Sequence, residues 1–69
     1  NAVSPGFVET ELTRKSLSKT EIIELTEKIP LNRLAQAIEI ANFVVFLCSD
    51  LNSFMTGQNL VIDGGYTNV

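Results

Sequence analysis

Apolar residues change their spacing along the chain, and each spacing predicts a different element. Ala2 and Val3 are adjacent apolar residues that are expected to end a strand. Residues 4–6 (Ser-Pro-Gly) should close that strand with a turn, because proline fixes φ and glycine tolerates a positive φ. Residues 7–13 show neither helical nor strand spacing, so we expect an ordered loop there.

A first helix is expected from about Lys19 to Lys28. Ser18 and Glu21 have the spacing of a capping box, in which each side chain accepts a hydrogen bond from the other residue's backbone amide. Apolar residues then recur at helical intervals as far as Ile29. Pro30 should stop the helix, because the residue before a proline is driven out of the α region.

A second helix is expected from about Ala37 to Ser49, and it is apolar on most of its surface. Two neighbouring stripes run along it, one of Ile38, Ala41, Val45 and Cys48 and one of Ile40, Val44 and Leu47. A helix that is apolar on most sides is buried on most sides. These stripes are therefore expected to form core or subunit contact, and Cys48 to be a buried, inert thiol.

The last expected element is a strand from Asn59 to Ile62. Its apolar residues do not alternate with polar ones, as in a strand that is covered on both faces of a parallel sheet. The Asp-Gly-Gly sequence at 63–65 should be a plain turn, because no helix amino terminus is expected after it to bind phosphate. The order of strand end, helices and strand is one crossover of an α/β sheet, and one crossover is not a domain.

Composition excludes several classes of protein. The chain has 69 residues, a hydrophobic fraction of 45% and a net charge of −3, which argues against both disorder and nucleic-acid binding. The longest strongly apolar run, 43–48, is too short to span a membrane. There is no His and a single Cys, so no intrachain disulfide can form, and a metal site is not expected. A cytoplasmic protein is expected, and the non-Met start inside a strand suggests a piece of a longer chain.

Six short blocks together carry a resemblance to a known family. They are Asn1 to Thr10, Ile29-Pro30-Leu31 with Arg33, Glu39-Ile40-Ala41, Phe46 to Asp50, Thr56-Gly57-Gln58 and Asp63-Gly64-Gly65. In this order and spacing they resemble the short-chain dehydrogenase/reductase family, and within it the group of 3-oxoacyl-(acyl carrier protein) reductases. Any single block is weak evidence, whereas the ordered set is highly specific.

The resemblance implies the fold class. Residues 1–69 would be the C-terminal fragment of a single NAD(P)-binding Rossmann-fold domain, with a doubly wound parallel α/β sheet. They would supply the end of the sixth strand, the substrate-loop helices, the large helix and the seventh strand. The remaining partners would be the rest of that domain, a small carbonyl or alcohol substrate and further copies in a dimer or tetramer.

The resemblance also implies site residues, carried over position by position. Pro5 and Gly6 would let the chain approach the nicotinamide of NAD or NADP closely. The backbone of Val8 would bond the carboxamide, and the Thr10 hydroxyl would contact the carboxamide or a phosphate. Phe7 and Leu12, with the region 16–29, would shape the substrate pocket.

No catalytic residue is expected in this chain. The family's Gly-rich loop and its Ser, Tyr and Lys have no counterparts here, and Tyr66 is not followed by a Lys four positions later. We therefore expect the isolated 69-residue chain to be inactive. The identity of the substrate and the choice between NAD and NADP stay open at this point.

Several alternatives accompany this interpretation. A small stand-alone α/β interaction module without catalysis is the alternative function. Arg33 could bind a cofactor phosphate, but a structural ion pair with a carboxylate is favoured, and Glu9, Glu11 and Asp50 are interpreted as scattered surface charge. The family usually has Gly at position 32 and Pro-Glu at 37–38, so the start of the large helix is less firmly predicted. Phe43, Phe46 or Leu47 is expected at a subunit contact.

Overall fold

The computed structural model describes residues 1–68, which form short strands and helices around a two-stranded parallel sheet. In chain order the elements are β1 (Ala2–Pro5), β2 (Val8–Glu9), α1 (Glu11–Ser16), α2 (Lys19–Glu27), β3 (Ala35–Gln36), α3 (Ala37–Leu47), β4 (Asn59–Ile62) and a 3-10 helix (Tyr66–Asn68). Among these residues no helix is long and apolar enough to cross a membrane.

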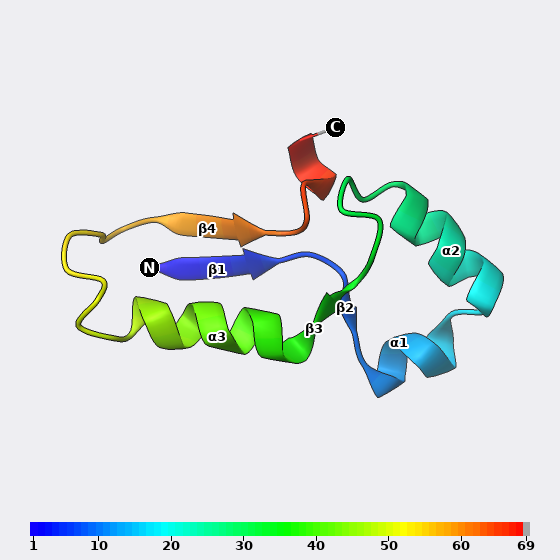
Figure 1. The fold of residues 1–69 in the computed structure, drawn as a ribbon, viewed down its shortest axis with the longest axis horizontal. Coiled ribbons are helices and arrows are strands. Elements are labelled where there is room, and N and C mark those ends of the chain that lie inside the picture. Colours follow the sequence, from blue (N-terminus) through cyan, green and yellow to red (C-terminus); the bar gives the residue numbers. More distant parts are fainter. Residues whose placement is uncertain (69) are drawn as a thin grey trace.

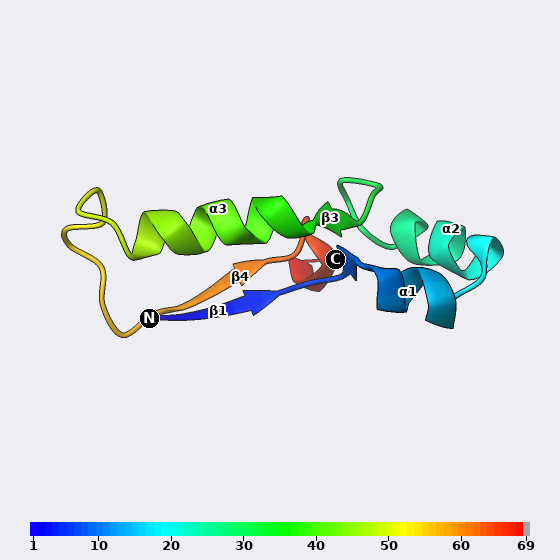
Figure 2. The same cartoon turned by 90° about the horizontal axis from the view of Figure 1, so that it is seen from below.

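The first and the last strand lie side by side. β1 pairs with β4 in parallel, with Ala2 opposite Asn59 and Pro5 opposite Ile62. α3 runs along one face of this pair, as the two perpendicular views show (Figures 1 and 2). The expected crossover of a parallel α/β sheet is therefore confirmed.

The predicted turn at residues 4–6 is wrong, because β1 continues through Pro5. Gly6 still donates its N–H to the Ile62 carbonyl oxygen at 3.0 Å, and Ala2 donates to the Gln58 carbonyl oxygen at 2.8 Å. The amides of Ala2 and Gly6, four residues apart, therefore face β4, and the strand alternation directs the nitrogen of Pro5 away from it. A proline is tolerated at such a position because no ladder donor is needed there.

The predicted loop at residues 7–13 is also wrong. Val8 and Glu9 form β2, which pairs in parallel with Ala35 and Gln36 of β3. The helix α1 begins directly afterwards, with Thr10 as its N-cap. A strand of two residues is too short to show a period, and a helix of six residues shows less than two turns of one.

Both longer helices are confirmed, with small changes at their ends. The capping box of Ser18 and Glu21 is present in α2, which ends one residue before the expected position. α3 begins at Ala37 without a proline, because the Glu39 carboxylate accepts the Gln36 N–H at 2.9 Å. It ends at Leu47, two residues early. The Ser49 and Asn52 side chains donate to carbonyl oxygens of its last turn, so a polar cluster ends the helix as expected.

The two apolar stripes of α3 have different environments. Ile40 and Leu47 of the second stripe are half-buried together with Phe43 and share the face toward the sheet, whereas Val44 of that stripe is 40% exposed. The whole stripe of Ile38, Ala41, Val45 and Cys48 is exposed. The expectation of a buried Cys48 thiol is therefore wrong within this chain. Cys48 is the C-cap residue of α3, and its side chain is exposed in the part of the chain that the structure describes.

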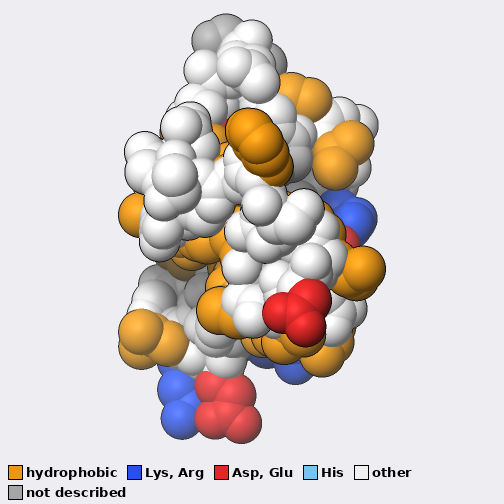
Figure 3. Space-filling model, turned by 90° about the vertical axis from the view of Figure 1, so that its left-hand side faces the viewer, with side chains coloured by type: hydrophobic (Ala, Val, Ile, Leu, Met, Phe, Trp, Pro, Cys, Tyr) orange, Lys and Arg blue, Asp and Glu red, His pale blue; other side chains and the backbone are white. Residues whose placement is uncertain are grey.

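Little of the chain is fully buried. Among the described residues the buried hydrophobic side chains are Ile29 and Leu34, both in the connection before α3. β4 is covered on one face only, since Leu60 and Ile62 are half-buried while Val61 is 54% exposed. From the end where the chain starts and α3 finishes, hydrophobic side chains reach the surface at several places (Figure 3).

The shape is that of an open layer. The principal extents are 43 × 26 × 15 Å and the radius of gyration is 13.8 Å, compared with about 11 Å for a compact chain of this length. The accessible surface is 5278 Å², compared with roughly 4,300 Å² for a compact protein of this mass. The elements are formed, but they enclose almost no core.

Candidate functional site

The candidate site lies beyond the carboxyl ends of β1 and β4. Both strands point toward the side of the molecule where β2, β3 and the 3-10 helix meet (Figure 1). Ligands of open α/β sheets bind at this edge, where the connections leave the strands. In this chain the connection that leaves β1 is the segment from Gly6 through α1, and it contains most of the site residues predicted from the sequence.

Three of the predicted residues line one open apolar hollow of about 300 Å³. Phe7, Val8 and Leu12 line it, together with Thr13, Ser16, Leu17 and Leu25 from α1, its C-cap and α2. The expected substrate-shaping residues Phe7 and Leu12 are thus brought together with the region 16–29. Leu12 is 73% exposed and Phe7 41% exposed, so both side chains are accessible to a ligand.

The backbone of Val8 faces away from β3. Ala35 donates its N–H to the Phe7 carbonyl oxygen at 3.0 Å. In a parallel ladder, the residue that follows such an acceptor, here Val8, directs its own N–H and carbonyl oxygen to the opposite side. The Val8 carbonyl oxygen accepts a hydrogen bond from the Thr13 hydroxyl at 3.1 Å. The Val8 N–H is therefore oriented so that a ligand outside the β2–β3 pair could accept its hydrogen bond.

Thr10 has a structural role that the sequence analysis missed. Its hydroxyl accepts the Thr13 N–H at 3.2 Å and lies 3.1 Å from the Thr13 hydroxyl, which caps α1. The side chain is exposed and is not part of the apolar hollow. The Thr-x-x-Thr spacing at 10 and 13 is the signal for this cap, because an N-cap hydroxyl bonds the amide three residues later.

Pro5 and Gly6 line a second hollow of about 410 Å³. It lies next to the first, with Phe7 shared between the two, and its other lining residues are Ser4, Asn59, Val61, Asp63, Tyr66 and Thr67. The Phe7 and Tyr66 rings meet edge to face, with centroids 5.1 Å apart. A Cβ on Gly6 would lie 2.7 Å from the Cβ of Asp63, so glycine is required by the close approach of β1 to β4.

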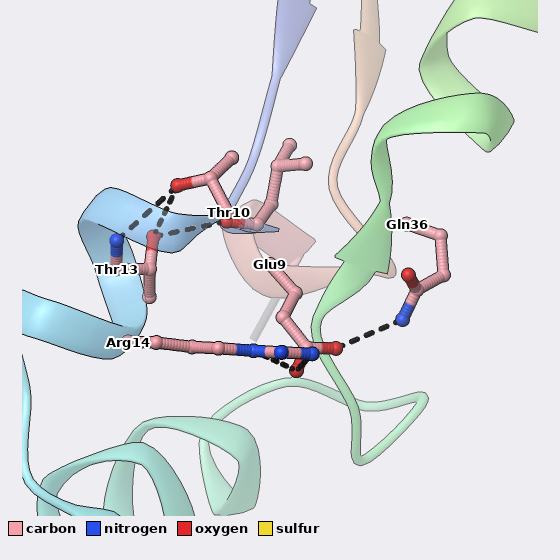
Figure 4. Close-up of polar contacts among 6 residues, drawn as sticks. Glu9, Thr10, Thr13, Arg14 and Gln36 are labelled. Carbon is pink, nitrogen blue, oxygen red and sulfur yellow. Dashed lines mark hydrogen bonds and ion pairs between the residues drawn. The ribbon is translucent and has the colours of Figure 1, made fainter.

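Glu9 bridges α1 and the start of α3 (Figure 4). Its Oε1 accepts hydrogen bonds from the Arg14 guanidinium at 2.7 and 3.0 Å, and its Oε2 accepts one from the Gln36 side-chain amide at 2.9 Å. Arg14 first, and Gln36 second, hold the pKa of this carboxyl below its usual value. Glu9 is therefore a surface charge, as expected, but it joins two elements and is not isolated.

The favoured role for Arg33 is confirmed. Its guanidinium donates to both carboxylate oxygens of Glu39 at 2.7 and 2.9 Å. These bonds, followed by the one from the Gln36 backbone N–H, lower the pKa of Glu39 to about 2. Arg33 thus stabilises the start of α3, where Glu39 also replaces the missing first-turn proline.

The Asp-Gly-Gly sequence forms a turn, as predicted. Gly64 and Gly65 have φ values of 65° and 93°, and the Asp63 carboxylate accepts hydrogen bonds from Gly65 and Thr67. The Thr67 hydroxyl, then the Thr67 amide, keep the pKa of Asp63 below its usual value. A 3-10 helix follows, contrary to expectation, but it has three residues. In the described part of the chain, no three His, Cys, Asp or Glu side chains converge as metal ligands.

Comparison with known proteins gives consistent matches along nearly the whole chain. A family model described as enoyl-(acyl carrier protein) reductase matches residues 1–67. The chain is 46% identical over 65 residues to a 3-oxoacyl-(acyl-carrier-protein) reductase of Aquifex aeolicus, covering 94% of this chain and 26% of the relative. It is 41% identical over 66 residues to an L-rhamnose 1-dehydrogenase (NAD(P)(+)) of Azotobacter vinelandii, with the same coverage.

Solved structures agree with this result. The chain superimposes with a TM-score of 0.86 on a short-chain dehydrogenase family protein of Francisella tularensis, at 42% identity. That match covers 97% of this chain and 32% of the solved one. The chain spans about a quarter of the length of the curated relatives that it matches.

Proposed function

Because the chain belongs to the short-chain dehydrogenase/reductase family, we propose that it is the nicotinamide-facing part of an NAD(P)-dependent oxidoreductase. The parent protein would transfer a hydride between the cofactor and a carbonyl or alcohol substrate. The observation that carries the proposal is the convergence of Phe7, Val8 and Leu12 on one hollow beyond the end of β1.

The residues after β1 fit a nicotinamide cofactor in the orientation of their groups. The outward N–H of Val8 can donate to a carboxamide oxygen, and the exposed Thr10 hydroxyl lies two residues further along the same segment. When bound, the cofactor supplies or accepts the hydride. The chain's own contribution is to orient the nicotinamide ring, with Pro5, Gly6 and Phe7 lining the neighbouring hollow.

The apolar hollow fits a small substrate with a hydrophobic part. Leu12, Leu17 and Leu25 supply aliphatic surface from α1 and α2, and no charged side chain lines this hollow in the described residues. An acyl chain or a similar apolar group matches this surface. Because one relative is a 3-oxoacyl reductase, the first substrate class to test is an acyl chain with a ketone at its third carbon.

We also assign this chain a role in assembly. The exposed stripe of Ile38, Ala41, Val45 and Cys48 on α3 is a continuous apolar surface on the side away from the sheet. An apolar face of this kind fits a second copy of the same helix about a two-fold axis. Of the three residues expected at a subunit contact, Phe43 and Leu47 are half-buried toward the sheet, which leaves Phe46 at the edge of the outer surface.

The alternative, a stand-alone interaction module, is less well supported. A module of this kind needs a core of its own, and the described residues bury only Ile29 and Leu34. The open face of β4 and the extended shape fit a segment that packs on the rest of a larger domain. The same reasoning makes residues 1–69 one part of a Rossmann-type domain.

The test is turnover by the full-length protein that contains this chain. In the presence of a 3-oxoacyl thioester, we expect NADH or NADPH to be oxidised, which a fall in absorbance measures. The second substrate class to test is an aldose, whose oxidation would reduce NAD or NADP. Binding of each dinucleotide should be measured separately by fluorescence of the reduced nicotinamide. Absence of both binding and turnover would contradict the proposal, and turnover with one substrate class would identify it.

A further inference from the structure

We propose that Glu9, Arg14 and Gln36 form a clamp that sets the position of Val8 and Thr10, and that Glu9 and Gln36 are thereby positioning residues for the nicotinamide cofactor. This inference rests on the proposed function. Neither Glu9 nor Gln36 would touch the cofactor in this arrangement. They act through the segment that does.

The clamp joins two parts of the chain that are far apart in sequence. Gln36 donates to Glu9 across 27 positions, whereas the bonds from Arg14 to Glu9 are local. Gln36 is also the N-cap residue of α3, which lies along the β1–β4 sheet. The bond from Gln36 therefore connects the ligand-facing segment to the start of α3 (Figure 4).

The segment needs this connection because its other tethers are short. The β2–β3 ladder consists of two residue pairs. α1 has six residues, fewer than a helix needs to be stable by itself. The Thr10–Thr13 cap holds α1 together internally, but it does not attach it to the sheet. Glu9 follows Val8 and precedes Thr10, so a displacement of Glu9 moves both.

The carboxylate divides its oxygens between the two partners. Its side chain is 30% exposed, while that of Arg14 is 67% exposed. An exposed ion pair contributes little, because water and salt screen it and two flexible side chains must be ordered. The Gln36 bond is also exposed, but it spans 27 positions whereas the Arg14 bonds span five, so Gln36 is the partner that links Glu9 to α3 and Arg14 orients the carboxylate locally.

The experiment uses the full-length protein with Gln36→Leu, Glu9→Leu and the double variant. Gln58→Leu is the matched control, because among the described residues the Gln58 side chain makes one local bond, to the Thr56 carbonyl oxygen at 3.3 Å. Two quantities are measured for each: the Kd of NADH and NADPH, and amide hydrogen exchange of residues 7–13 without cofactor. The melting temperature is recorded as a measure of folding.

We expect Gln36→Leu to raise the Kd about fivefold, the size that one exposed hydrogen bond supports, and to speed exchange in residues 7–13. The double variant should be no worse than the poorer single variant, and Gln58→Leu should change neither quantity. An unchanged Kd and unchanged exchange in Gln36→Leu would overturn the clamp, even if the melting temperature fell. If the unaltered protein binds neither dinucleotide, the proposed function fails, and faster exchange in Gln36→Leu would still support the clamp itself.

Discussion

At the residue scale, Thr10 shows how one hydroxyl can serve folding and binding together. It caps α1 through the Thr13 amide, and in the proposed function it also faces the cofactor. A substitution by valine removes both roles, so that variant alone cannot separate them. Asparagine is an equally good N-cap but places an amide where the hydroxyl was.

We therefore expect Thr10→Val to lower the stability of the full-length protein by about 0.5–2 kcal/mol. It should also raise the Kd of the dinucleotide by about two- to tenfold, as the loss of one hydrogen bond would. Thr10→Asn should keep the stability and still raise the Kd. Thermal melts and fluorescence titrations measure the two effects. If Thr10→Asn binds the cofactor as well as the original protein does, the hydroxyl is only a cap.

Gly6 marks what the sequence can and cannot predict about a single residue. Pro5 and Gly6 were expected to form a turn at the cofactor site, and they line one of the hollows there. The reason given, a turn with positive φ, is wrong, since Gly6 is needed where its backbone passes Asp63. A contact between residues 57 positions apart has no local pattern, so the sequence alone could not supply this reason. Glu9 and Gln36 were missed for the same cause.

At the element scale, α2, α3 and β4 were predicted to within two residues at each end. The two helices have a helical period or a cap, and β4 is an apolar run bounded by turn residues. β2, β3 and α1 were not, because each is too short for a period and depends on its neighbours. The start of α3 is the instructive case. Its usual proline is absent, and Glu39 replaces it by accepting bonds from Gln36 and Arg33.

The low pKa of Glu39 predicts how the stability of this helix start depends on pH. A carboxyl whose pKa falls from 4.5 when unfolded to about 2 when folded stabilises the fold while it is ionised. That contribution is complete above about pH 4.5 and is lost as the pH falls toward 2. Glu39→Gln should thus lower the melting temperature at pH 7, and the difference from the unaltered protein should shrink between pH 4.5 and 2. A difference that stays constant over this range would contradict the ion pair as its source.

At the scale of the whole molecule, the chain consists of formed elements around almost no core. Periodicity predicted that α3 would be apolar on most sides, and its two stripes were identified from the sequence. Which stripe faces the sheet could not be predicted, because neighbouring stripes are equally apolar. The structure assigns Ile40, Phe43 and Leu47 to the sheet and leaves Ile38, Ala41 and Val45 outside.

This assignment changes which residues test the proposed subunit contact. Ile38 is 62% exposed on α3 and Ile23 is 58% exposed on α2, so the same exchange can be made at two equally accessible isoleucines. If the outer stripe meets another copy, Ile38→Glu buries an unpaired carboxylate at a cost of several kcal/mol, and the full-length oligomer should dissociate into smaller species. Ile23→Glu should keep the original mass.

Size-exclusion chromatography with light scattering at several protein concentrations measures this directly. Phe46→Glu, at the edge of the same surface, should weaken assembly less than Ile38→Glu does. Leu47→Glu is unsuitable, because its half-buried side chain faces the sheet and the change would unfold the helix. If Ile38→Glu, Val45→Glu and Phe46→Glu all keep the mass and melting temperature of the original protein, α3 is not a subunit contact. Its apolar outer stripe must then be covered by another part of the full-length protein, outside these 69 residues.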